Sequence, residues 1–322
     1  MSISKSVFLP VSPSTAFDLV TSPERLRRWQ TVAARMELRA GGDYRWTMTP
    51  GHSVAGTVKE IEPGRRLVIG WGWEGSESSP STLTITLEPT EGGITLTLLH
   101  EGLAAEDVAG HVEGWNHFMD RLVRFSTDGD AGPDEWAALP DPINELNSAE
   151  ATLAIVQRVL NQLKATDAAL PTPCENFTVS QLVDHLVGSV VGIGKALGVD
   201  HVDNDSATAE ARVADAAQAT LEAFTKRGLE GTINMGFAEL PATTVANILN
   251  LEFLVHAWDL ATATGAELDV TPGLSDYVLS LARNTIGPQM RGTSFAEETL
   301  VDESAASLER LMAFTGRDVA AR

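Results

Sequence analysis

The sequence is poor in cysteine and in basic residues. Its 322 residues include one cysteine, Cys174, which excludes an intrachain disulfide framework and any zinc ribbon. A metal site would therefore use nitrogen and oxygen ligands, for which 7 histidines and 44 acidic residues are present. Lysine and arginine total 23, so the formal net charge is −21. This negative charge disfavours nucleic acid and anionic membrane surfaces as partners of the whole chain.

Long apolar runs are also missing. Residues 1–5 lack the apolar segment of a signal peptide. The longest apolar stretch, around residues 186–193, is interrupted by Gly188, Ser189 and Gly192 and is far too short to cross a bilayer. We therefore expect a cytoplasmic protein with no membrane partner. The hydrophobic fraction of 43% is typical of a globular protein, and 322 residues exceed one ordinary core, so two domains are expected.

The sequence changes character between residues 126 and 142, where aspartate, glycine and proline are concentrated. This composition is typical of a linker. Before it, stretches of the sequence alternate between polar and apolar residues; after it, apolar residues recur at helical spacing. We predict a first domain over residues 1–127, a linker over 128–146 and a second domain over 147–322.

The first domain is predicted to be an α+β domain with an antiparallel sheet. Residues 82–87 and 94–98 alternate strictly on either side of a turn, which predicts a hairpin with one apolar face. Residues 7–9 suit a first strand. Ser12-Pro13 and Ser22-Pro23 predict two helix starts, each with a serine cap. From residue 108 to 125 the apolar spacing predicts a long C-terminal helix packed against the sheet.

Five short motifs stand out in this domain: Pro23–Trp29, Glu37–Gly42, Gly56–Pro63, Arg66–Val68 and Gly114–Phe118. Together they resemble the SRPBCC superfamily, in the branch named after the activator of a chaperone ATPase. The resemblance covers about residues 1–127 and implies the helix-grip fold, with a ligand cavity between the sheet and the last helix. The family name says little about a chaperone role. Candidate wall residues of the cavity are Trp71, Trp73 and Trp115.

The second domain is predicted to be all-α. Ser148 is a candidate cap for a first helix, and Thr178-Val179-Ser180-Gln181 matches a capping box that starts a helix running to about Leu197. Further helices are expected over residues 208–227, 241–264, 274–286 and 303–314. Helices throughout indicate a helical bundle.

The helix expected over residues 241–264 carries ionisable residues on an apolar face. Glu252, His256 and Asp259 follow the helical spacing of its apolar residues. A buried charge costs several kcal/mol unless it is paired or binds a metal. Glu252 and His256 are four residues apart, so they can bind one divalent ion together with a third ligand. His185 is the best candidate for that ligand and His201 a weaker one.

Simpler explanations compete with this metal site. From spacing alone, a glutamate and a histidine four residues apart are more often an ordinary ion pair, and Asp184 beside His185 suits a surface pair. Asp259 either accepts the second N–H of His256 or pairs with an arginine from another helix, and we slightly favour the arginine.

Three blocks of the second domain add a second resemblance: residues 172–188, 252–265 and 308–318. They resemble the DinB-like, mycothiol-dependent maleylpyruvate isomerase metal-binding family in an actinobacterial branch, over about residues 147–320. The resemblance implies a four-helix bundle with a divalent metal, usually zinc, whose ligands fall on His185, Glu252 and His256. The separate C-terminal domain of the isomerase has no clear counterpart here, which puts maleylpyruvate in doubt as the substrate. The helices after residue 265 either complete the bundle or form an extension.

Other reactive side chains have plainer explanations. Cys174 precedes a helix start that would lower a thiol pKa, but a small buried residue at a helix entrance is the commoner case. His100 ends a strand near the expected mouth of the cavity, where it is a candidate ligand contact. His111 and His117 are six residues apart, share no helix face and are expected to be surface or core residues.

Two functions follow. The first is a metal-dependent DinB-like thiol transferase or isomerase, with zinc as the expected metal, mycothiol as the thiol that the resemblance implies, and a small apolar molecule in the first domain. The second is a non-catalytic small-molecule-binding protein with a structural or vestigial metal. The sequence leaves the substrate, the catalytic residues and the oligomeric state open.

Overall fold

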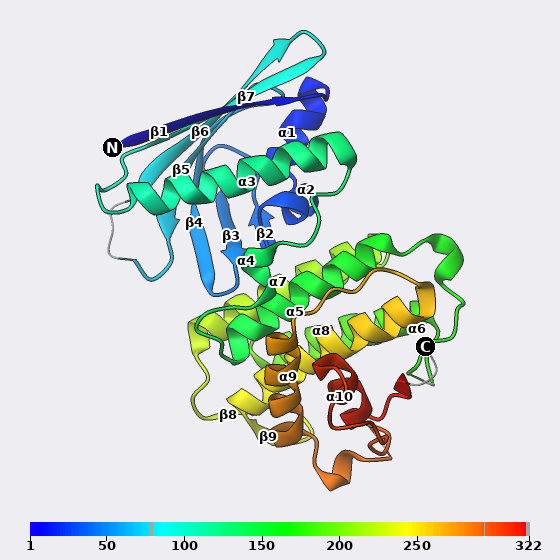
Figure 1. Ribbon diagram of the computed structural model, residues 1–322. Coiled ribbons are helices and arrows are strands. Elements are labelled where there is room, and N and C mark those ends of the chain that lie inside the picture. The colour runs from blue at the N-terminus through cyan, green and yellow to red at the C-terminus, as the bar shows by residue number, and fades with distance from the viewer. Residues whose placement is uncertain (77–79, 175, 293, 320–322) are drawn as a thin grey trace. The chain divides into compact units, whose positions relative to one another are not determined.

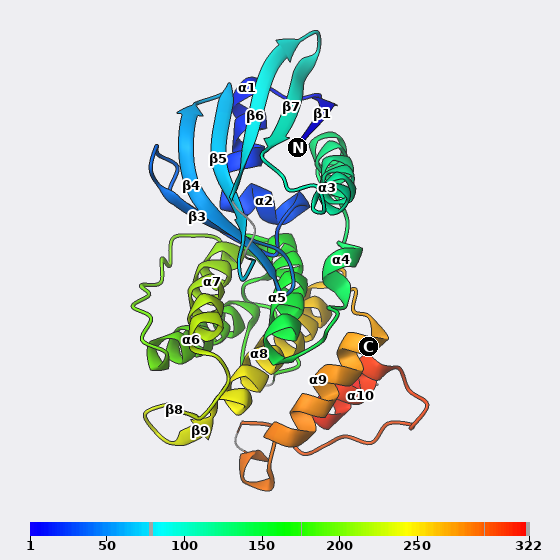
Figure 2. The same cartoon turned by 90° about the vertical axis from the view of Figure 1, so that its left-hand side faces the viewer.

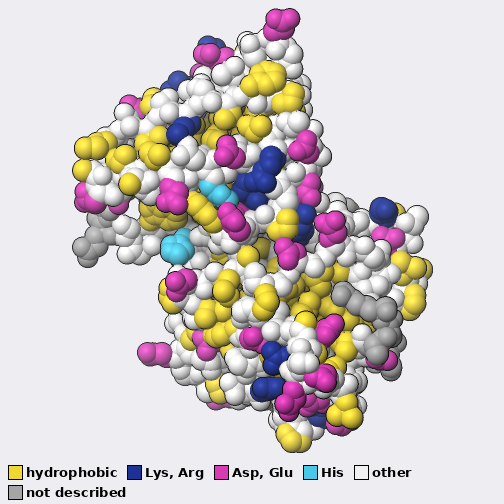
Figure 3. Space-filling model, viewed as in Figure 1, with side chains coloured by type: hydrophobic (Ala, Val, Ile, Leu, Met, Phe, Trp, Pro, Cys, Tyr) yellow, Lys and Arg dark blue, Asp and Glu magenta, His cyan; other side chains and the backbone are white. Residues whose placement is uncertain are grey.

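The computed structural model describes residues 1–76, 80–174, 176–292 and 294–319 (Figure 1). Residues 320–322, the end of the predicted second domain, lie outside the described residues. The chain divides into two compact units, residues 1–134 and 135–322. Among the described residues, no helix has both the length and the hydropathy needed to cross a membrane. Acidic side chains are spread over both units on the face shown in Figure 3.

The first unit contains one antiparallel sheet in the order β1-β7-β6-β5-β4-β3-β2. The predicted hairpin is confirmed: β6 and β7 pair with Ile85 opposite Leu98 and Leu87 opposite Leu96, and all four side chains are buried. The first strand is longer than predicted and pairs with β7. The strands are β1 (Ser2–Leu9), β2 (Ala33–Met36), β3 (Asp43–Thr49), β4 (His52–Glu62), β5 (Arg66–Trp73), β6 (Ser81–Thr90) and β7 (Gly93–Glu101).

Three helices, α1 (Pro13–Thr21), α2 (Pro23–Trp29) and α3 (Val108–Asp128), complete this unit. The sheet curves around them (Figures 1 and 2), and α3 contributes a buried apolar stripe that includes Trp115 and Leu122. Ser12 caps α1 as predicted, since its side chain accepts a hydrogen bond from the amide of Thr15. Ser22 precedes α2 but makes no side-chain cap, so that prediction is wrong in detail.

The second unit is mainly helical. A short ribbon of two three-residue strands, β8 (Thr232–Asn234) and β9 (Glu239–Pro241), departs from the all-α prediction. These strands are too short for an alternating pattern to show in the sequence. The helices are α4 (Glu135–Ala138), α5 (Glu145–Gln162), α6 (Val179–Ala196), α7 (Ala209–Arg227), α8 (Ala242–Thr264), α9 (Pro272–Thr285) and α10 (Ser307–Phe314), with 3-10 turns at Ala165–Asp167 and Pro288–Met290.

Four of these helices surround one core. α5 packs on α7 and α8, and α6 packs on the same two helices. α9 packs on α8 and α10 on α9, so the segment after residue 265 extends the four-helix core rather than completing it. The cap of α5 is Asn144, whose side chain accepts from the amides of Leu146 and Asn147; the prediction of Ser148 is wrong because that residue already lies inside the first turn.

Candidate metal centre

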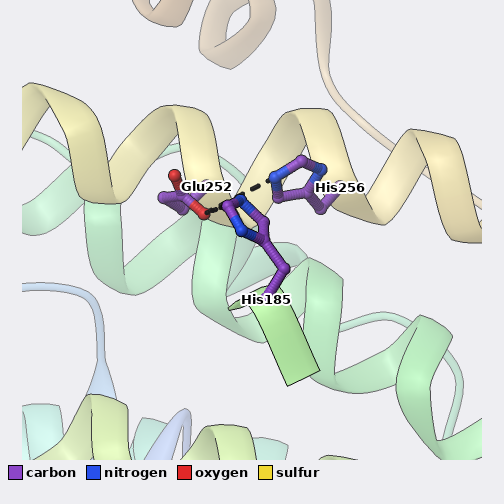
Figure 4. A group of neighbouring side chains, drawn as sticks. All are labelled: His185, Glu252 and His256. Carbon is purple, nitrogen blue, oxygen red and sulfur yellow. Dashed lines mark ion pairs between the residues drawn. The ribbon is translucent and has the colours of Figure 1, made fainter. Parts of the chain in front are cut away.

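Three predicted ligands converge where α6 packs on α8. His185 projects from α6, and Glu252 and His256 project from adjacent turns of α8 (Figure 4). Glu252 Oε2 lies 3.7 Å from His185 Nε2 and 3.5 Å from His256 Nε2. One donor atom from each residue lies within 4.8 Å of the other two. The structure therefore brings all three side chains to one point.

Local sequence explains how each helix presents its donor. The capping box of Thr178 and Gln181 is formed and sets the start of α6. Leu182 and Leu186 are fully buried, and His185 lies on the same side of the helix, three residues after the first leucine. α8 is buried on most of its circumference, which forces residues 252, 256 and 259 into the interior of the unit.

The carboxylate of Glu252 is unusual because one of its oxygens is buried without a hydrogen-bond partner. Oε2, the oxygen that faces both histidines, makes no hydrogen bond, and distances of 3.5 and 3.7 Å exceed the usual range for one. Burial would raise the pKa of Glu252, but His256, His185 and a hydrogen bond with Ser189 outweigh it and lower the pKa. Glu252 is therefore an anion with an unsatisfied oxygen at the centre of the cluster.

The two histidines differ in protonation. Burial would lower the pKa of His256, but the carboxylates of Asp259 and Glu252 outweigh burial and raise that pKa to about 9. Burial lowers the pKa of His185, and the nearby Glu252 only partly opposes this. The His185 ring stacks on Phe177, with centroids 5.0 Å apart and an interplanar angle of 26°. His185 is thus held neutral, with a ring nitrogen available as a ligand.

Asp259 makes both of the contacts that the sequence offered as alternatives. Its Oδ2 accepts from His256 Nδ1 at 3.0 Å, and its two oxygens accept from Arg317 at 2.8 and 3.2 Å. A carboxylate can only accept here, so His256 carries a proton on Nδ1. The arginine comes from the segment after α10.

These residues fit a divalent ion. Two imidazole nitrogens and one carboxylate oxygen are the donor set of catalytic zinc sites and of non-haem iron sites. Donors that share a tetrahedral zinc at 2.0–2.2 Å lie about 3.4 Å apart, close to the 3.5 and 3.7 Å separations from Glu252 Oε2. The unsatisfied Oε2 is the atom that such an ion would satisfy.

The remaining candidates of the second unit lie outside this cluster. His201 is not part of it. Asp184 pairs with Arg212 at 2.8 Å, whereas His185 faces Glu252, so the alternative of a surface pair between neighbours is not the arrangement seen. Cys174 is half-buried, and its carbonyl oxygen accepts from the amide of Phe177. Burial would lower the pKa of Arg317, but Asp259 outweighs it and raises that pKa. The Cys174 thiol is near enough to add a smaller contribution in the same direction.

In the first unit, His100 is a core residue. It is fully buried, so the expected place at a cavity mouth is wrong. Its Nδ1 accepts from Trp115 Nε1 at 3.1 Å, and its Nε2 therefore donates to Ser81 Oγ at 2.7 Å. His111 Nε2 accepts from Trp73 Nε1 at 3.1 Å. These bonds join two histidines to neutral partners.

The three predicted wall tryptophans lie together. The Trp71 ring centroid is 5.9 Å from that of Trp73 and 5.2 Å from that of Trp115 on α3. The three rings thus pack together, and the ligand cavity that they were expected to line stays a prediction. His117 is not part of this aromatic group. Its Nε2 pairs with Asp134 Oδ1 at 2.9 Å, at the end of the first unit.

Sequence reasoning missed three contributors to the centre. Ser189 lies one turn after His185 on α6, a spacing that places both on one face. Phe177 directly precedes the capping box of α6, and nothing in that local pattern assigns its ring to the centre. Arg317 lies within a motif block, but nothing in the sequence marks which arginine meets Asp259.

Comparisons with known proteins address the first unit most directly. Residues 10–126 match the family described as Activator of Hsp90 ATPase homolog 1-like protein. Among solved structures, CalU16 from Micromonospora echinospora is 26% identical with a TM-score of 0.35, covering 40% of this chain and 77% of that one. PFC0360w, an HSP90 activator from Plasmodium falciparum, is 21% identical with a TM-score of 0.35, covering 40% and 97%.

The family match assigns residues 10–126 of the first unit to a domain of the Hsp90-ATPase-activator-like class. A second match is longer than this unit: the uncharacterized protein Rv0738 of Mycobacterium tuberculosis is 31% identical over 183 residues, 56% of this chain and 99% of that protein. The chain belongs to the family of that protein. Because the first unit has 134 residues, the match includes part of the second unit.

Proposed function

We propose that the chain is a metal-dependent, DinB-like thiol transferase or isomerase, with zinc as the metal. The convergence of His185, Glu252 and His256 around the unsatisfied oxygen of Glu252 carries the proposal. The four-helix core and the motif blocks that resemble the maleylpyruvate isomerase family support it. Mycothiol is the thiol which that resemblance implies.

In this proposal the protein holds the ion with three ligands and leaves further positions open. When bound, a divalent ion would lower the pKa of a coordinated thiol or water and supply a nucleophile at neutral pH. Glu252 would provide the anionic ligand, and its contact with Ser189 would orient the carboxylate. Phe177 would hold the ring of His185 by stacking.

The first unit would bind a small apolar molecule. Trp71, Trp73 and Trp115, whose rings pack together, would line its site, and apolar and aromatic linings are typical of small-molecule sites. This part of the proposal is independent of the metal.

Metal analysis of the purified protein tests the centre and names the ion. We expect one equivalent of divalent metal in the wild type, and at least a 100-fold loss of zinc affinity in Glu252→Gln, since a lost ligand should cost more than the 10- to 100-fold typical of its supporting residues. Glu309→Gln, at an exposed glutamate of α10, is the matched control. A wild type that binds no divalent metal in competition with a chelator would remove the metal proposal.

A thiol-transfer assay separates the enzyme from its alternative. The metal-loaded protein should turn over an electrophile such as chlorodinitrobenzene in the presence of thiol, and Glu252→Gln should not. A protein that binds metal and an apolar ligand but shows no thiol-dependent turnover with a panel of electrophiles would instead be a binding protein with a structural metal.

A further inference from the structure

The segment after α10 returns to the interior of the second unit. Gly316 adopts a φ of +85°, and a Cβ there would lie 2.7 Å from the Cβ of Ala296, so the turn requires glycine. The next residue, Arg317, is held by its backbone: its amide donates to Met312 O, and its carbonyl accepts from Thr299 Oγ1. The chain thereby carries one arginine side chain inward.

Arg317 and Asp259 form a buried, two-pronged ion pair. Arg317 Nε donates to Asp259 Oδ1 at 3.2 Å and Nη2 donates to Oδ2 at 2.8 Å, while Nη1 donates to Thr315 O at 3.0 Å. The side chains of Arg317 and Asp259 are 7% and 0% exposed. Two parallel bonds fix the plane of the carboxylate as well as its position.

This fixed carboxylate also holds a predicted metal ligand. Asp259 Oδ2 accepts from Nδ1–H of His256, so Nε2 is the ring nitrogen left to bind a metal once its own proton is displaced. Nε2 is the atom that faces Glu252 Oε2. The contacts form one continuous series, from Arg317 through Asp259 and His256 to the centre of the cluster.

We propose that Arg317 is a positioning residue of the metal centre, which sets the orientation and tautomer of His256 through Asp259. The inference rests on the proposed metal site. Without the arginine, Asp259 would be a buried carboxylate with a single partner, and it would move or take up a proton. His256 would then lose the acceptor that directs Nε2 toward the ion.

The competing explanation is an ion pair that stabilises the fold alone. A double-mutant cycle separates the two, read as zinc affinity by chelator competition and as the visible absorption of the cobalt-substituted protein, at a temperature well below unfolding. The variants are Arg317→Met, Asp259→Asn and their combination. The matched control is Arg310→Met, which breaks a more exposed ion pair with Asp276 in the same region.

We expect Arg317→Met to weaken zinc binding about 10-fold and Asp259→Asn about 10- to 100-fold, with an altered cobalt spectrum in both. The double variant should bind as weakly as Asp259→Asn alone, because the arginine acts through the aspartate. Arg310→Met should leave affinity and spectrum unchanged. Arg317→Lys keeps the positive charge but cannot make the two parallel bonds to Asp259, so it should restore zinc affinity partly. If Arg317→Met fails to fold, Arg317→Lys is the variant that tests the role of Arg317.

The outcomes are distinguishable. If the wild type binds zinc and the folded Arg317 variants bind it equally well with an unchanged cobalt spectrum, the pair is only structural and this inference is wrong. A wild type that binds no zinc overturns the proposed function itself.

Discussion

Two buried histidines, one in each unit, have opposite protonation behaviour. His100 contacts neutral groups, Trp115 and Ser81, and burial together with nearby His111 lowers its pKa to about 3. His256 contacts two carboxylates, which overcome burial and raise its pKa to about 9. The two residues are almost equally buried, at 0% and 7% exposure. The partners, and not the depth of burial, decide the charge.

The same difference decides which ring can bind a metal. Both nitrogens of His100 are used by neutral partners, so a metal would have to displace a hydrogen bond. In His256, Nδ1 donates its hydrogen bond to Asp259, and Nε2 faces Glu252 and His185. A buried histidine is therefore a candidate ligand when a carboxylate holds one nitrogen and other donors face the second.

The largest expected effect is acid destabilisation of the first unit through His100. Its folded pKa of about 3 lies below the ordinary 6.5, so the stability it contributes is present above pH 6.5 and is lost as pH falls toward 3. A pKa shift of this size corresponds to a loss of about 5 kcal/mol in the free energy of unfolding. Urea unfolding followed by tryptophan fluorescence should show this loss in the wild type. The signal reports mainly this unit, which holds the tryptophans at positions 29, 46, 71, 73 and 115.

His100→Gln removes the titrating ring and should flatten the fall in unfolding free energy between pH 6.5 and 4. His52→Gln, at an exposed histidine of the same unit, is the control. Equal acid sensitivity in the wild type and His100→Gln would show that His100 is not kept neutral by the fold.

The next effect has the opposite sign and belongs to the metal-free second unit. The folded pKa of His256, about 9, lies above 6.5, so its stabilisation is complete below pH 6.5 and is lost as pH rises to 9. The free energy of unfolding should fall by about 3 kcal/mol over this range. It is measured by urea unfolding of chelator-treated protein, followed by helical circular dichroism.

His256→Gln should abolish this alkaline loss, and His201→Gln should not. Zinc affinity should rise over the same pH range, since a metal must displace the proton on Nε2. An affinity independent of pH between 6.5 and 9 would contradict the charged form of His256.

The sequence contained much of this centre and only part of its surroundings. Glu252 and His256 were recognisable because two ionisable residues four apart interrupt an apolar helix face. His185 lies 67 positions before Glu252, and no spacing rule joins residues on different helices. Its place in a capped helix favours it over His201, and the motif resemblance then names it as a ligand. Arg317 could not be predicted because its position depends on a tertiary turn at Gly316.

In the fold, too, most features set by local sequence could be predicted, and features set by tertiary packing could not. The hairpin of β6 and β7 and the capped start of α6 follow from local patterns, and both are present. The cap at Asn144 is also local, but the pattern does not distinguish it from Ser148. The ribbon of β8 and β9 and the burial of His100 depend on packing, which a local pattern does not contain.

The smallest expected effect concerns His185, the less constrained of the two histidines among the candidate metal ligands. A buried carboxylate fixes His256, whereas a stacked ring, that of Phe177, packs on His185, which is 37% exposed. An aromatic pair contributes about 0.5–1.5 kcal/mol, or roughly a 2- to 10-fold change in an equilibrium constant. Phe177→Leu should therefore weaken zinc binding about 2- to 10-fold, less than Asp259→Asn, when measured by chelator competition. Phe237→Leu, at a phenylalanine that is 81% exposed, should change nothing. If Phe177→Leu instead weakens zinc binding as strongly as Asp259→Asn, the stacked ring fixes His185 as firmly as the carboxylate fixes His256, and the contrast between the two ligands disappears.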